Sequence, residues 1–367
     1  MRLGLFVVMA GRNTTGPDAY ERNLIRELAA GTHDELHVFC LNRQATATFS
    51  ENRLQCHVLK PAMRWISIPV SLPLALRRAG IELMHATFVP PPFSPVNFVF
   101  THHCFSTFVH PEFYRPATLY RLNKLITAGL RKARQVICVS ENVRDLTREK
   151  FGVEDERLCV VYNGVSERFR PLPADQVKRA LRQDFHIDRS YFLYAGNLQQ
   201  RKNVGRLIRA YAEFVHTTDN DTLLVLAGSK DQVAEDYDAL ILTLGLEERV
   251  MRLGHVPHED LPVLYCGALA FAFPSLWEGF GMPVIEAMAC GTPVLTSRLS
   301  SLPEVAGGAA RLVDPYSVED IASGLDTLYR DEALRTRMAA QGLARAREFS
   351  WKKTARETHA AYRRALL

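Results

Sequence analysis

Short apolar runs alternate with longer amphipathic stretches along the whole chain. The apolar runs have the length of buried strands, and the stretches between them have the spacing of helices with one apolar face. Runs of strand length lie at 3–9, 36–40, 83–86, 98–100, 136–139, 191–194, 222–227, 268–273 and 294–296. Strands and helices in alternation predict parallel sheets covered by helices on both faces, which is an α/β fold.

The chain is too long for one ordinary hydrophobic core. Its 367 residues predict two domains, since single domains commonly hold about 150 to 200 residues. A Pro-rich stretch at 169–173, followed by a charged helix and a turn at 186–190, separates two groups of strands. We therefore place the boundary near residue 170, which gives an N-terminal domain at 1–170, a C-terminal domain at 171–350 and a final helix at 351–367.

The composition is that of a soluble globular protein, with 47% hydrophobic and 23% charged residues. No apolar run approaches the roughly 18 to 20 residues that a membrane-spanning helix requires, and the apolar start is too short for a signal peptide. The seven cysteines are scattered without a C-x-x-C pair, so they predict neither a disulfide framework nor a zinc site. We expect a cytoplasmic protein.

Basic residues are concentrated in the first half of the chain. Residues 1–170 hold 22 Lys and Arg against 15 Asp and Glu, whereas the remainder holds 23 against 25. In the run 114–134, apolar residues are interleaved with Arg115, Arg121, Lys124, Arg131, Lys132 and Arg134. Such a helix can lie on an anionic membrane, here the inner face of the plasma membrane. We favour the alternative, a solvated helix packed on its own domain; a nucleic-acid partner fits worse, because no recognition module is found.

The most informative segment is 274–293, which reads PSLWEGFGMPVIEAMACGTP. An apolar strand precedes it, Pro283 suits the first position of a helix, and Gly291 suits its C-terminal stop. A strand, a glycine turn and a helix are therefore expected. This turn places backbone N–H groups at the positive end of a helix dipole, where phosphates bind; these are the groups of Gly279, Phe280, Gly281 and Met282.

Glu278 and Glu286 flank this turn and need a different partner. A diphosphate would repel a carboxylate, so both side chains make sense as acceptors of hydrogen bonds from neutral hydroxyls on the same ligand. Ribose and hexose carry such hydroxyls. For Glu286 the alternative is a carboxylate in the first turn of the helix, where the helix dipole stabilises it without any ligand.

A second charged loop follows the predicted strand 191–194. The stretch 196–203 reads GNLQQRKN and places Arg201 and Lys202 at the carboxyl end of that strand, where open α/β sheets bind ligands. Arg201 can grip a phosphate with two parallel hydrogen bonds, and Lys202 adds a point charge. Together they would stabilise a departing diphosphate; the alternative is a surface loop with two solvated cations.

Two D-x-D patterns, at 219–221 and 236–238, are not expected to bind metal. The first precedes its strand and the second lies in an expected helix, so both are interpreted as polar surface residues. We expect no essential metal, because cations and a helix N-terminus would supply the same electrostatic stabilisation.

Together these motifs resemble the Glu-x7-Glu pattern of retaining glycosyltransferases with the GT-B architecture, family 4 in particular, written here as EGFGMPVIE. The resemblance runs from Gly16 through His103, 163–164, 196–203 and 254–291, nearly the whole chain. It implies two Rossmann-like, doubly wound parallel-sheet domains that face each other across a cleft, with the final helix crossing back to the first domain. It also implies hexose transfer from a nucleoside-diphosphate sugar with retained anomeric configuration and no cofactor.

The family assigns roles to the C-terminal motifs. Glu278 would face the donor sugar and Glu286 the ribose, while Gly196, Arg201 and Lys202 would surround the diphosphate. The backbone of 254–257, including Val256, would meet the edge of the nucleobase. Asn197 departs from many relatives, which have a basic residue close to this position.

The family also assigns roles near the N-terminus. Gly16, in the loop 11–18 before a helix expected near Ala19, would let that loop approach the donor phosphates; Pro17 replaces a second glycine and removes one N–H. His103 would hydrogen-bond the transferred sugar, with Cys104 in place of the usual aspartate. His102 is a weaker candidate, because neighbouring strand residues face opposite sides.

The chain looks most like bacterial mannosyltransferases of surface polysaccharide assembly, in lipopolysaccharide, O-antigen or exopolysaccharide biosynthesis. This favours GDP-mannose as donor over a GDP-deoxyhexose or a UDP-hexose, with a saccharide or lipid-linked saccharide as acceptor. Two alternatives stay open: a sugar-nucleotide epimerase of the same architecture, and a non-catalytic two-lobed sugar-binding protein.

Overall fold

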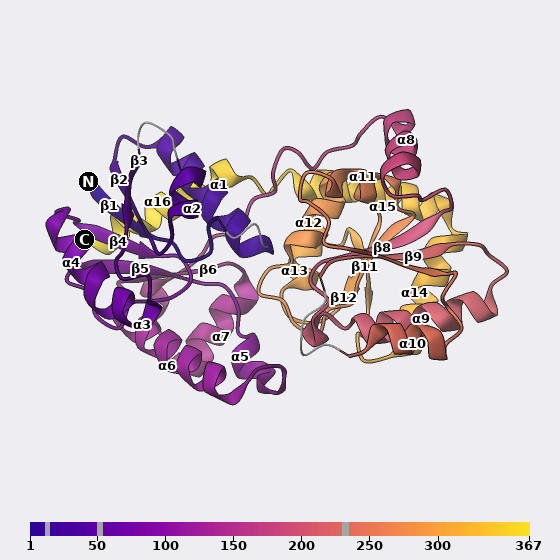
Figure 1. Ribbon diagram of the computed structural model, residues 1–367, viewed down its shortest axis with the longest axis horizontal. Helices are drawn as coiled ribbons and strands as arrows, with labels where there is room; N and C mark the ends of the chain where they lie inside the picture. The colour runs from indigo at the N-terminus through magenta and orange to yellow at the C-terminus, as the bar shows by residue number, and fades with distance from the viewer. Residues whose placement is uncertain (12–14, 50–53, 230–234) are drawn as a thin grey trace. The chain divides into compact units, whose positions relative to one another are not determined.

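The computed structural model describes residues 1–11, 15–49, 54–229 and 235–367. The chain divides into two compact units, Met1–Gly164 with Ser350–Leu367 and Val165–Phe349. Each unit is built around one parallel sheet with helices on its faces (Figure 1). The predicted α/β class, with two Rossmann-like domains, is confirmed.

The first sheet has seven parallel strands in the order β3-β2-β1-β4-β5-β6-β7. They are β1 (Arg2–Phe6), β2 (Glu35–Cys40), β3 (Leu54–Val58), β4 (Leu83–Ala86), β5 (Asn97–His102), β6 (Gln135–Cys138) and β7 (Leu158–Val160). The helices of this unit are α1 (Thr15–Gly31), α2 (Arg43–Thr48), α3 (Arg64–Ile66), α4 (Leu72–Arg78), α5 (Ser106–Val109), α6 (Pro116–Lys132), α7 (Glu141–Phe151) and α16 (Trp351–Leu366). Every residue of β4 is buried, as expected for a strand covered on both faces.

The second sheet has six parallel strands in the order β10-β9-β8-β11-β12-β13. They are β8 (Tyr191–Ala195), β9 (Leu223–Ala227), β10 (Val250–Gly254), β11 (Ala270–Phe273), β12 (Val294–Ser297) and β13 (Ala310–Val313). The helices are α8 (Ala174–Asp184), the short 3₁₀ turn η4 (Gln200–Lys202), α9 (Val204–Thr217), α10 (Tyr237–Thr243), α11 (Leu261–Gly267), α12 (Met282–Ala289), α13 (Leu302–Ala306), α14 (Val318–Arg330) and α15 (Glu332–Ala346).

Each sheet has one switch point at which successive strands are added on opposite sides. It lies between β1 and β4 in the first sheet and between β8 and β11 in the second. Open α/β sheets bind ligands beyond the carboxyl ends of their strands at such points. The loops after β8 and β11 are therefore the positions from which a site in the second unit is built.

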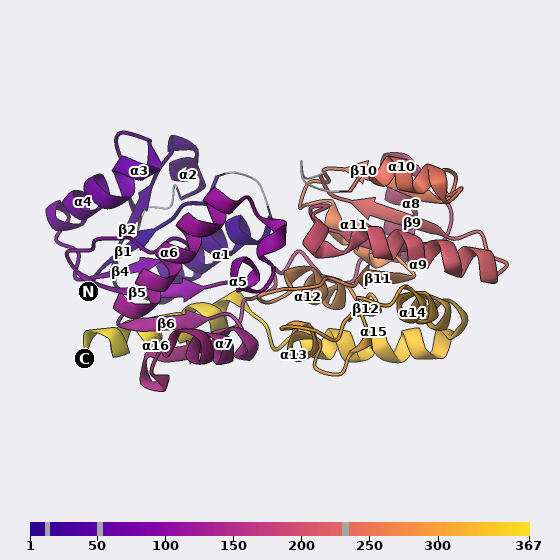
Figure 2. The ribbon, with the colours of Figure 1, turned by 90° about the horizontal axis from the view of Figure 1, so that it is seen from below.

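The final helix α16 belongs to the first unit. Tyr362 on α16 contacts His85 Nδ1 through its hydroxyl at 2.7 Å, and Thr354 Oγ1 donates to the carbonyl of Tyr162 at 2.7 Å. Figure 2 shows this yellow helix among the indigo and violet elements of the N-terminal half. The last residues of the chain thus complete the core of the first unit.

The bounds of two predicted strands are wrong. The first strand, expected at 3–9, ends at Phe6, because the N–H groups of Val8, Met9 and Ala10 donate to the Glu21 carboxylate at 3.0, 2.8 and 2.6 Å rather than to a neighbouring strand. The strand expected at 268–273 begins at Ala270. Four strands, β3, β7, β10 and β13, are not among the predicted runs.

The units divide between Gly164 and Val165, before the boundary predicted near residue 170. The Phe169 ring packs at 5.9 Å on Tyr265, and the Arg170 carbonyl accepts a hydrogen bond from Cys266 Sγ at 3.4 Å. The Pro-rich stretch is therefore tied to the second unit. All seven cysteines are free thiols, and among the helices of the described ranges none combines the length and hydropathy needed to cross a bilayer.

Candidate active site

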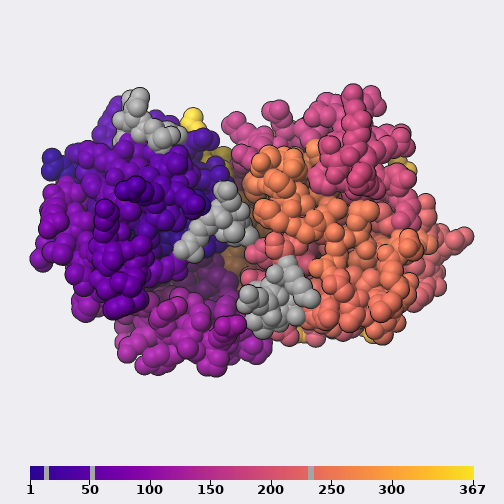
Figure 3. All heavy atoms as spheres, in the orientation of Figure 1, coloured from indigo at the N-terminus to yellow at the C-terminus, as the bar shows by residue number. Residues whose placement is uncertain are grey.

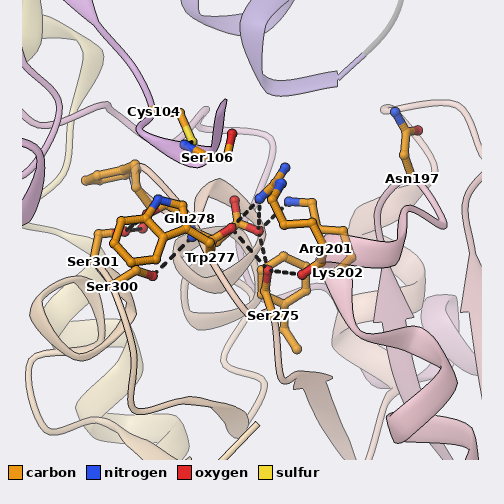
Figure 4. Close-up of polar contacts among 12 residues, drawn as sticks. Cys104, Ser106, Asn197, Arg201, Lys202, Ser275, Trp277, Glu278, Ser300 and Ser301 are labelled. Carbon is orange, nitrogen blue, oxygen red and sulfur yellow. Dashed lines mark hydrogen bonds and ion pairs between the residues drawn. The ribbon is translucent and has the colours of Figure 1, made fainter. Parts of the chain in front are cut away.

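Two loops at the carboxyl edge of the second sheet carry the charged residues of the site. The turn η4 follows β8 and holds Arg201 and Lys202, and the loop after β11 holds Glu278. Because β8 and β11 are neighbouring strands, the two loops meet at the switch point. Figure 4 shows the three side chains pointing toward one another.

The Glu278 carboxylate is at the centre of this cluster. Its Oε1 accepts hydrogen bonds from Lys202 Nζ at 2.5 Å and from Ser275 Oγ at 2.7 Å, and it lies 3.2 Å from Arg201 Nη1. Arg201 also donates to the carbonyl of Trp277. These three contacts all use Oε1.

The cluster is buried and charged. Glu278 is only 7% exposed, and the side chains of Arg201 and Lys202 are 14% and 13% exposed. Burial by itself would raise the pKa of Glu278, but the charges of Lys202 and Arg201 outweigh this effect, so the pKa lies below its ordinary value. The carboxylate is ionised at neutral pH. An anion with two adjoining cations suits a ligand that presents both hydroxyls and a diphosphate.

Asn203 fastens the two loops together. Its backbone is in the left-handed conformation with φ of 63°, which asparagine tolerates better than most residues. Its Nδ2 donates to the carbonyls of Pro274 at 3.0 Å and Pro315 at 2.6 Å, and the Leu276 N–H donates to the carbonyl of Arg201 at 3.0 Å. The asparagine of the Arg-Lys-Asn run thus positions the two cations through the backbone.

The turn into α12 requires glycine at position 281. Gly281 has φ of 108°, and a Cβ on it would lie 2.7 Å from Leu302 Cδ2. Ser300 Oγ accepts the N–H of Glu278 at 3.0 Å, and Ser301 Oγ donates to two carbonyls of the same turn at 3.1 and 2.9 Å. These bonds hold the segment 279–282 at the N-terminus of α12.

Glu286 lies in the second turn of α12, not in the first as the sequence predicted. The helix begins at Met282 after an N-cap at Gly281, so the dipole acts on Glu286 less strongly than on a first-turn residue. Its side chain is 8% exposed and lies 3.5 Å from His258 Nε2, and it accepts a hydrogen bond from the Tyr265 hydroxyl at 3.3 Å. These polar partners, rather than the helix end, hold the carboxylate.

Gly196 and Val256, which the sequence also predicted, lie on loops whose backbones are linked through Gly228. Gly196 follows β8 with φ of 145°, and a Cβ on Gly228 would lie 1.8 Å from the Gly196 carbonyl oxygen. The Gly228 N–H donates to the carbonyl of Gly254 at 2.7 Å, which joins the loop holding Val256 to this pair. Only glycine permits this close approach of the loops.

In the first unit, His103 lies just beyond β5. Its Nε2–H donates to the Thr87 carbonyl at 2.8 Å, and its ring stacks on Phe88 with centroids 3.8 Å apart. Burial lowers the pKa of His103 to about 3, so the imidazole is neutral and Nδ1 is its acceptor. His102 instead contacts Thr147 at 3.1 Å, as the alternation along a strand requires.

Gly16 lies in the first turn of α1, because this helix begins at Thr15 rather than near Ala19. Residues 12–14 of the predicted phosphate loop lie outside the described residues. Asp18 accepts the N–H of Gly11 at 2.9 Å and lies 2.9 Å from Arg22 Nη2, so the side chain of Asp18 is used within the loop and its helix.

The sequence matches two family models, Glycosyltransferase Family 4 at residues 15–169 and Glycosyl transferases group 1 at residues 177–345. It is 33% identical to O-antigen chain mannosyltransferase B of Escherichia coli, over 72% of this chain and 70% of that protein. The chain belongs to the family 4 glycosyltransferases. It is also 30% identical to the serotype-specific mannosyltransferase WbdA of E. coli, over 64% of this chain and 29% of WbdA.

A solved structure with the same fold is that of Anabaena HepE in complex with UDP and glucose. The TM-score is 0.80 at 19% sequence identity, and the alignment covers 99% of this chain and 100% of that one. At this identity the likeness concerns the fold. The glycosyltransferase thus has the GT-B fold that its sequence predicted.

The structure of the glycosyltransferase brings part of the predicted site together. Arg201, Lys202 and Glu278 are in contact, whereas Gly16 and His103 belong to the other unit. Asp219 and Asp221 precede β9, and Asp236 caps α10. Over the residues that the structure describes, no group of three or more His, Cys, Asp or Glu is arranged to hold a metal ion.

The sequence interpretation missed the residues that position the charged ones. Ser275 lies just after an expected strand and three positions before Glu278, so the sequence could have indicated its contact with that carboxylate. Ser300 and Ser301 lie more than twenty positions further on, and no local pattern links them to the glycine turn.

Glu21 on α1 is the largest omission. It is fully buried, and besides the N–H groups of residues 8–10 it accepts a hydrogen bond from Thr87 Oγ1 at 2.6 Å. The carbonyl of Thr87 in turn accepts from His103. No local pattern marks this glutamate, because the donors that its buried carboxylate needs lie 11 to 66 positions away.

We expect Asn203→Ala to reduce the free energy of unfolding by roughly 2 to 4 kcal/mol, because two carbonyls lose a buried donor and alanine disfavours the left-handed backbone. Urea denaturation measures this loss. Asn203→Gly, which relieves the backbone but still lacks the amide, should lose about 1 kcal/mol less. Equal stability of Asn203→Ala and the wild type would contradict a positioning role.

Proposed function

We propose that the glycosyltransferase moves mannose from GDP-mannose to a hydroxyl of a growing O-antigen or related surface polysaccharide, at the cytoplasmic side of the membrane. The observation that carries the proposal is the Arg201, Lys202 and Glu278 cluster on the glycine turn, in a chain whose relatives include mannosyltransferase B and WbdA. The HepE structure is a complex with UDP and glucose, which supports a nucleoside-diphosphate sugar as donor, while the choice of base rests on the mannosyltransferases.

In the proposed reaction, the acceptor hydroxyl oxygen bonds to the sugar C1 while the bond between C1 and the diphosphate oxygen breaks. Negative charge grows on the leaving diphosphate, which takes up the hydroxyl proton. Arg201 and Lys202 stabilise that charge, together with the N–H groups at the start of α12. These cations supply the positive charge that a metal ion supplies in other enzymes, so we propose that catalysis needs no metal. Glu278 orients the transferred sugar through its hydroxyls, and Glu286 holds the ribose.

We further propose that the anomeric configuration is retained by attack on the face from which the diphosphate leaves. A double displacement would need a carboxylate nucleophile close to C1. Glu278 Oε1 is bonded to Lys202 and Ser275 and lies close to Arg201, and such contacts reduce the nucleophilicity of a carboxylate. This supports a role for Glu278 in hydrogen bonding instead of covalent attack.

The membrane location is supported by α6. Arg115, Arg121, Lys124, Arg131, Lys132 and Arg134 are all exposed on or beside this helix, while Leu130 is buried against the first unit. This arrangement fits the favoured packing of α6 on its own domain, and it also presents the basic face outward. A lipid-linked acceptor would bring that face to an anionic surface.

The test is turnover with a panel of sugar nucleotides and a saccharide acceptor, with release of the diphosphate and formation of the product measured together. GDP-mannose is expected to give equal amounts of both, with an α-linked product from the α-linked donor. A free, altered sugar nucleotide would indicate an epimerase, and binding without turnover would indicate a binding protein. Turnover with UDP-sugars alone would overturn the donor assignment, and loss of activity in EDTA would overturn metal independence.

A further inference from the structure

Large apolar side chains are exposed together on one segment of the first unit. Ten large apolar residues are exposed within the described ranges, and four of them lie between positions 63 and 74: Met63, Trp65, Val70 and Leu74, with exposures of 48%, 74%, 51% and 47%. The segment runs through α3, the π-helical turn η1 (Ser67–Ser71) and α4. These elements lie at the periphery of the first unit (Figures 1 and 2), and its outer surface is visible at the left of Figure 3.

The segment is folded onto the unit along its other face. Ile68, Leu72 and Leu76 are 8%, 0% and 0% exposed. Ser71 Oγ donates a hydrogen bond to the carbonyl of Lys60 at 2.6 Å, and Ser67 Oγ donates one to the carbonyl of Pro61. Both serines thus bind back to the N-terminal end of the segment. The exposed apolar residues are therefore not part of a loose loop. They form the outer face of an amphipathic element whose inner face belongs to the core.

The charges within this segment have one sign. Residues 60–80 contain four basic residues and no Asp or Glu, and all four are exposed: Lys60, Arg64, Arg77 and Arg78. Tryptophan prefers the boundary between headgroups and acyl chains, and arginine and lysine keep their charges at the level of the phosphates while their stems lie on apolar surface. A segment that exposes both an apolar face and four cations is complementary to an anionic bilayer.

We propose that the segment 60–78 is an interfacial anchor that inserts Trp65, Met63, Val70 and Leu74 into the surface of an anionic membrane. The proposal extends the membrane location given above and adds a larger apolar face to the contact, since α6 exposes only Tyr120 among its large apolar residues. A second copy of the chain fits less well, because a two-fold contact through this face would bring four cations against four.

Binding of the full-length protein to extruded vesicles tests this anchor, with phosphatidylethanolamine–phosphatidylglycerol vesicles compared with neutral phosphatidylcholine vesicles. The chain has three tryptophans. Trp65 is exposed, whereas Trp277 is half-buried and Trp351 is buried. Anionic vesicles are therefore expected to shift the fluorescence emission to the blue. Trp65→Phe should still bind while losing most of this shift.

Trp65→Ser combined with Leu74→Ser should weaken binding to anionic vesicles at least about tenfold, because burial of one large apolar side chain contributes about that much. Arg77→Glu with Arg78→Glu should weaken it by about fivefold or more for each charge. Leu242→Ser is the matched control, since Leu242 is 65% exposed on α10 of the other unit, and it should bind like the wild type. Melting curves and donor binding show that each variant is folded.

The outcomes separate this anchor from the proposed function. Loss of binding in the Trp65 and Leu74 variant, with unchanged transfer to a soluble oligosaccharide, supports the anchor whichever sugar is transferred. Unchanged binding of that variant overturns the anchor. If replacement of Arg131, Lys132 and Arg134 by glutamate then abolishes binding, the membrane contact belongs to α6 alone. A dimer that dissociates in the variant, without any change in vesicle binding, assigns the surface to a second copy and also overturns the anchor.

Discussion

Replacing Lys202 by alanine is expected to lower kcat at least about 10²-fold, the scale of one electrostatic contact made in a transition state. Lys202 Nζ is 2.5 Å from Glu278 and only 13% of its side chain is exposed, so its charge acts in a site with little water. The contribution grows as the diphosphate departs, and the loss should therefore be larger in kcat than in the KM for the donor. Arg201→Ala should behave in the same way.

Steady-state kinetics with the preferred donor measure the effect. Lys178→Ala is the matched control, because Lys178 is an exposed lysine on α8 of the same unit, and it should turn over like the wild type. A Lys202→Ala enzyme with near-normal kcat, or one in which only the donor KM rises, would show that the cation does not stabilise the leaving group.

Glu278→Gln is expected to cost a similar factor, at least about 10²-fold in kcat, although the amide has the shape of the carboxylate. The change removes the anion that orders Lys202 and Arg201 and weakens the hydrogen bonds offered to the sugar hydroxyls. It should also destabilise the protein, because two buried cations lose their counter-ion. Kinetics and urea denaturation of the same variant report the two losses separately.

The stability loss in Glu278→Gln should depend on pH with a defined sign. The pKa of Glu278 is lowered in the folded protein, since Lys202 and Arg201 outweigh the effect of burial. The carboxylate therefore contributes stability above its ordinary pKa, and this contribution disappears as the pH falls through the lowered value. The difference in stability between wild type and variant should be full at neutral pH and shrink in acid. A difference that grows in acid would contradict the ion-pair assignment.

The double variant Lys202→Met with Glu278→Gln separates structure from catalysis. If the two residues serve only their own ion pair, removing both should restore stability and turnover together. If they act on the donor as proposed, stability recovers in part while kcat stays low. Recovery of turnover would refute the catalytic roles of both residues and show that their salt bridge serves only the structure.

Much of the fold follows from local pattern, and the strands that escaped share a physical feature. β3, β7, β10 and β13 are the edge strands of the two sheets. An edge strand has one neighbour and is partly exposed, so its sequence carries a weaker apolar signal; β3 reads LQCHV with four half-buried positions. Their pairing partners, not their own residues, make them strands.

The candidate site shows the same division. The charged residues on the loops after two strands and the glycine turn before α12 could be predicted, because each depends on a few adjacent residues. The second-turn position of Glu286, the serines that hold the turn and the buried Glu21 could not, since each depends on where an element begins or on a distant partner.

The sequence by itself determined the alternation of strands and helices, the presence of two sheets, and which residue types stand at the ends of the strands. Only the tertiary structure decided that Lys202 and Glu278, 76 residues apart, would share a hydrogen bond, or that Glu21 would reach Thr87 across 66 residues. The reason is that hydrophobic periodicity specifies which face of an element is buried but not which element lies beside it. The order of strands in each sheet brings these side chains together, and that order exists only when the whole sheet has formed.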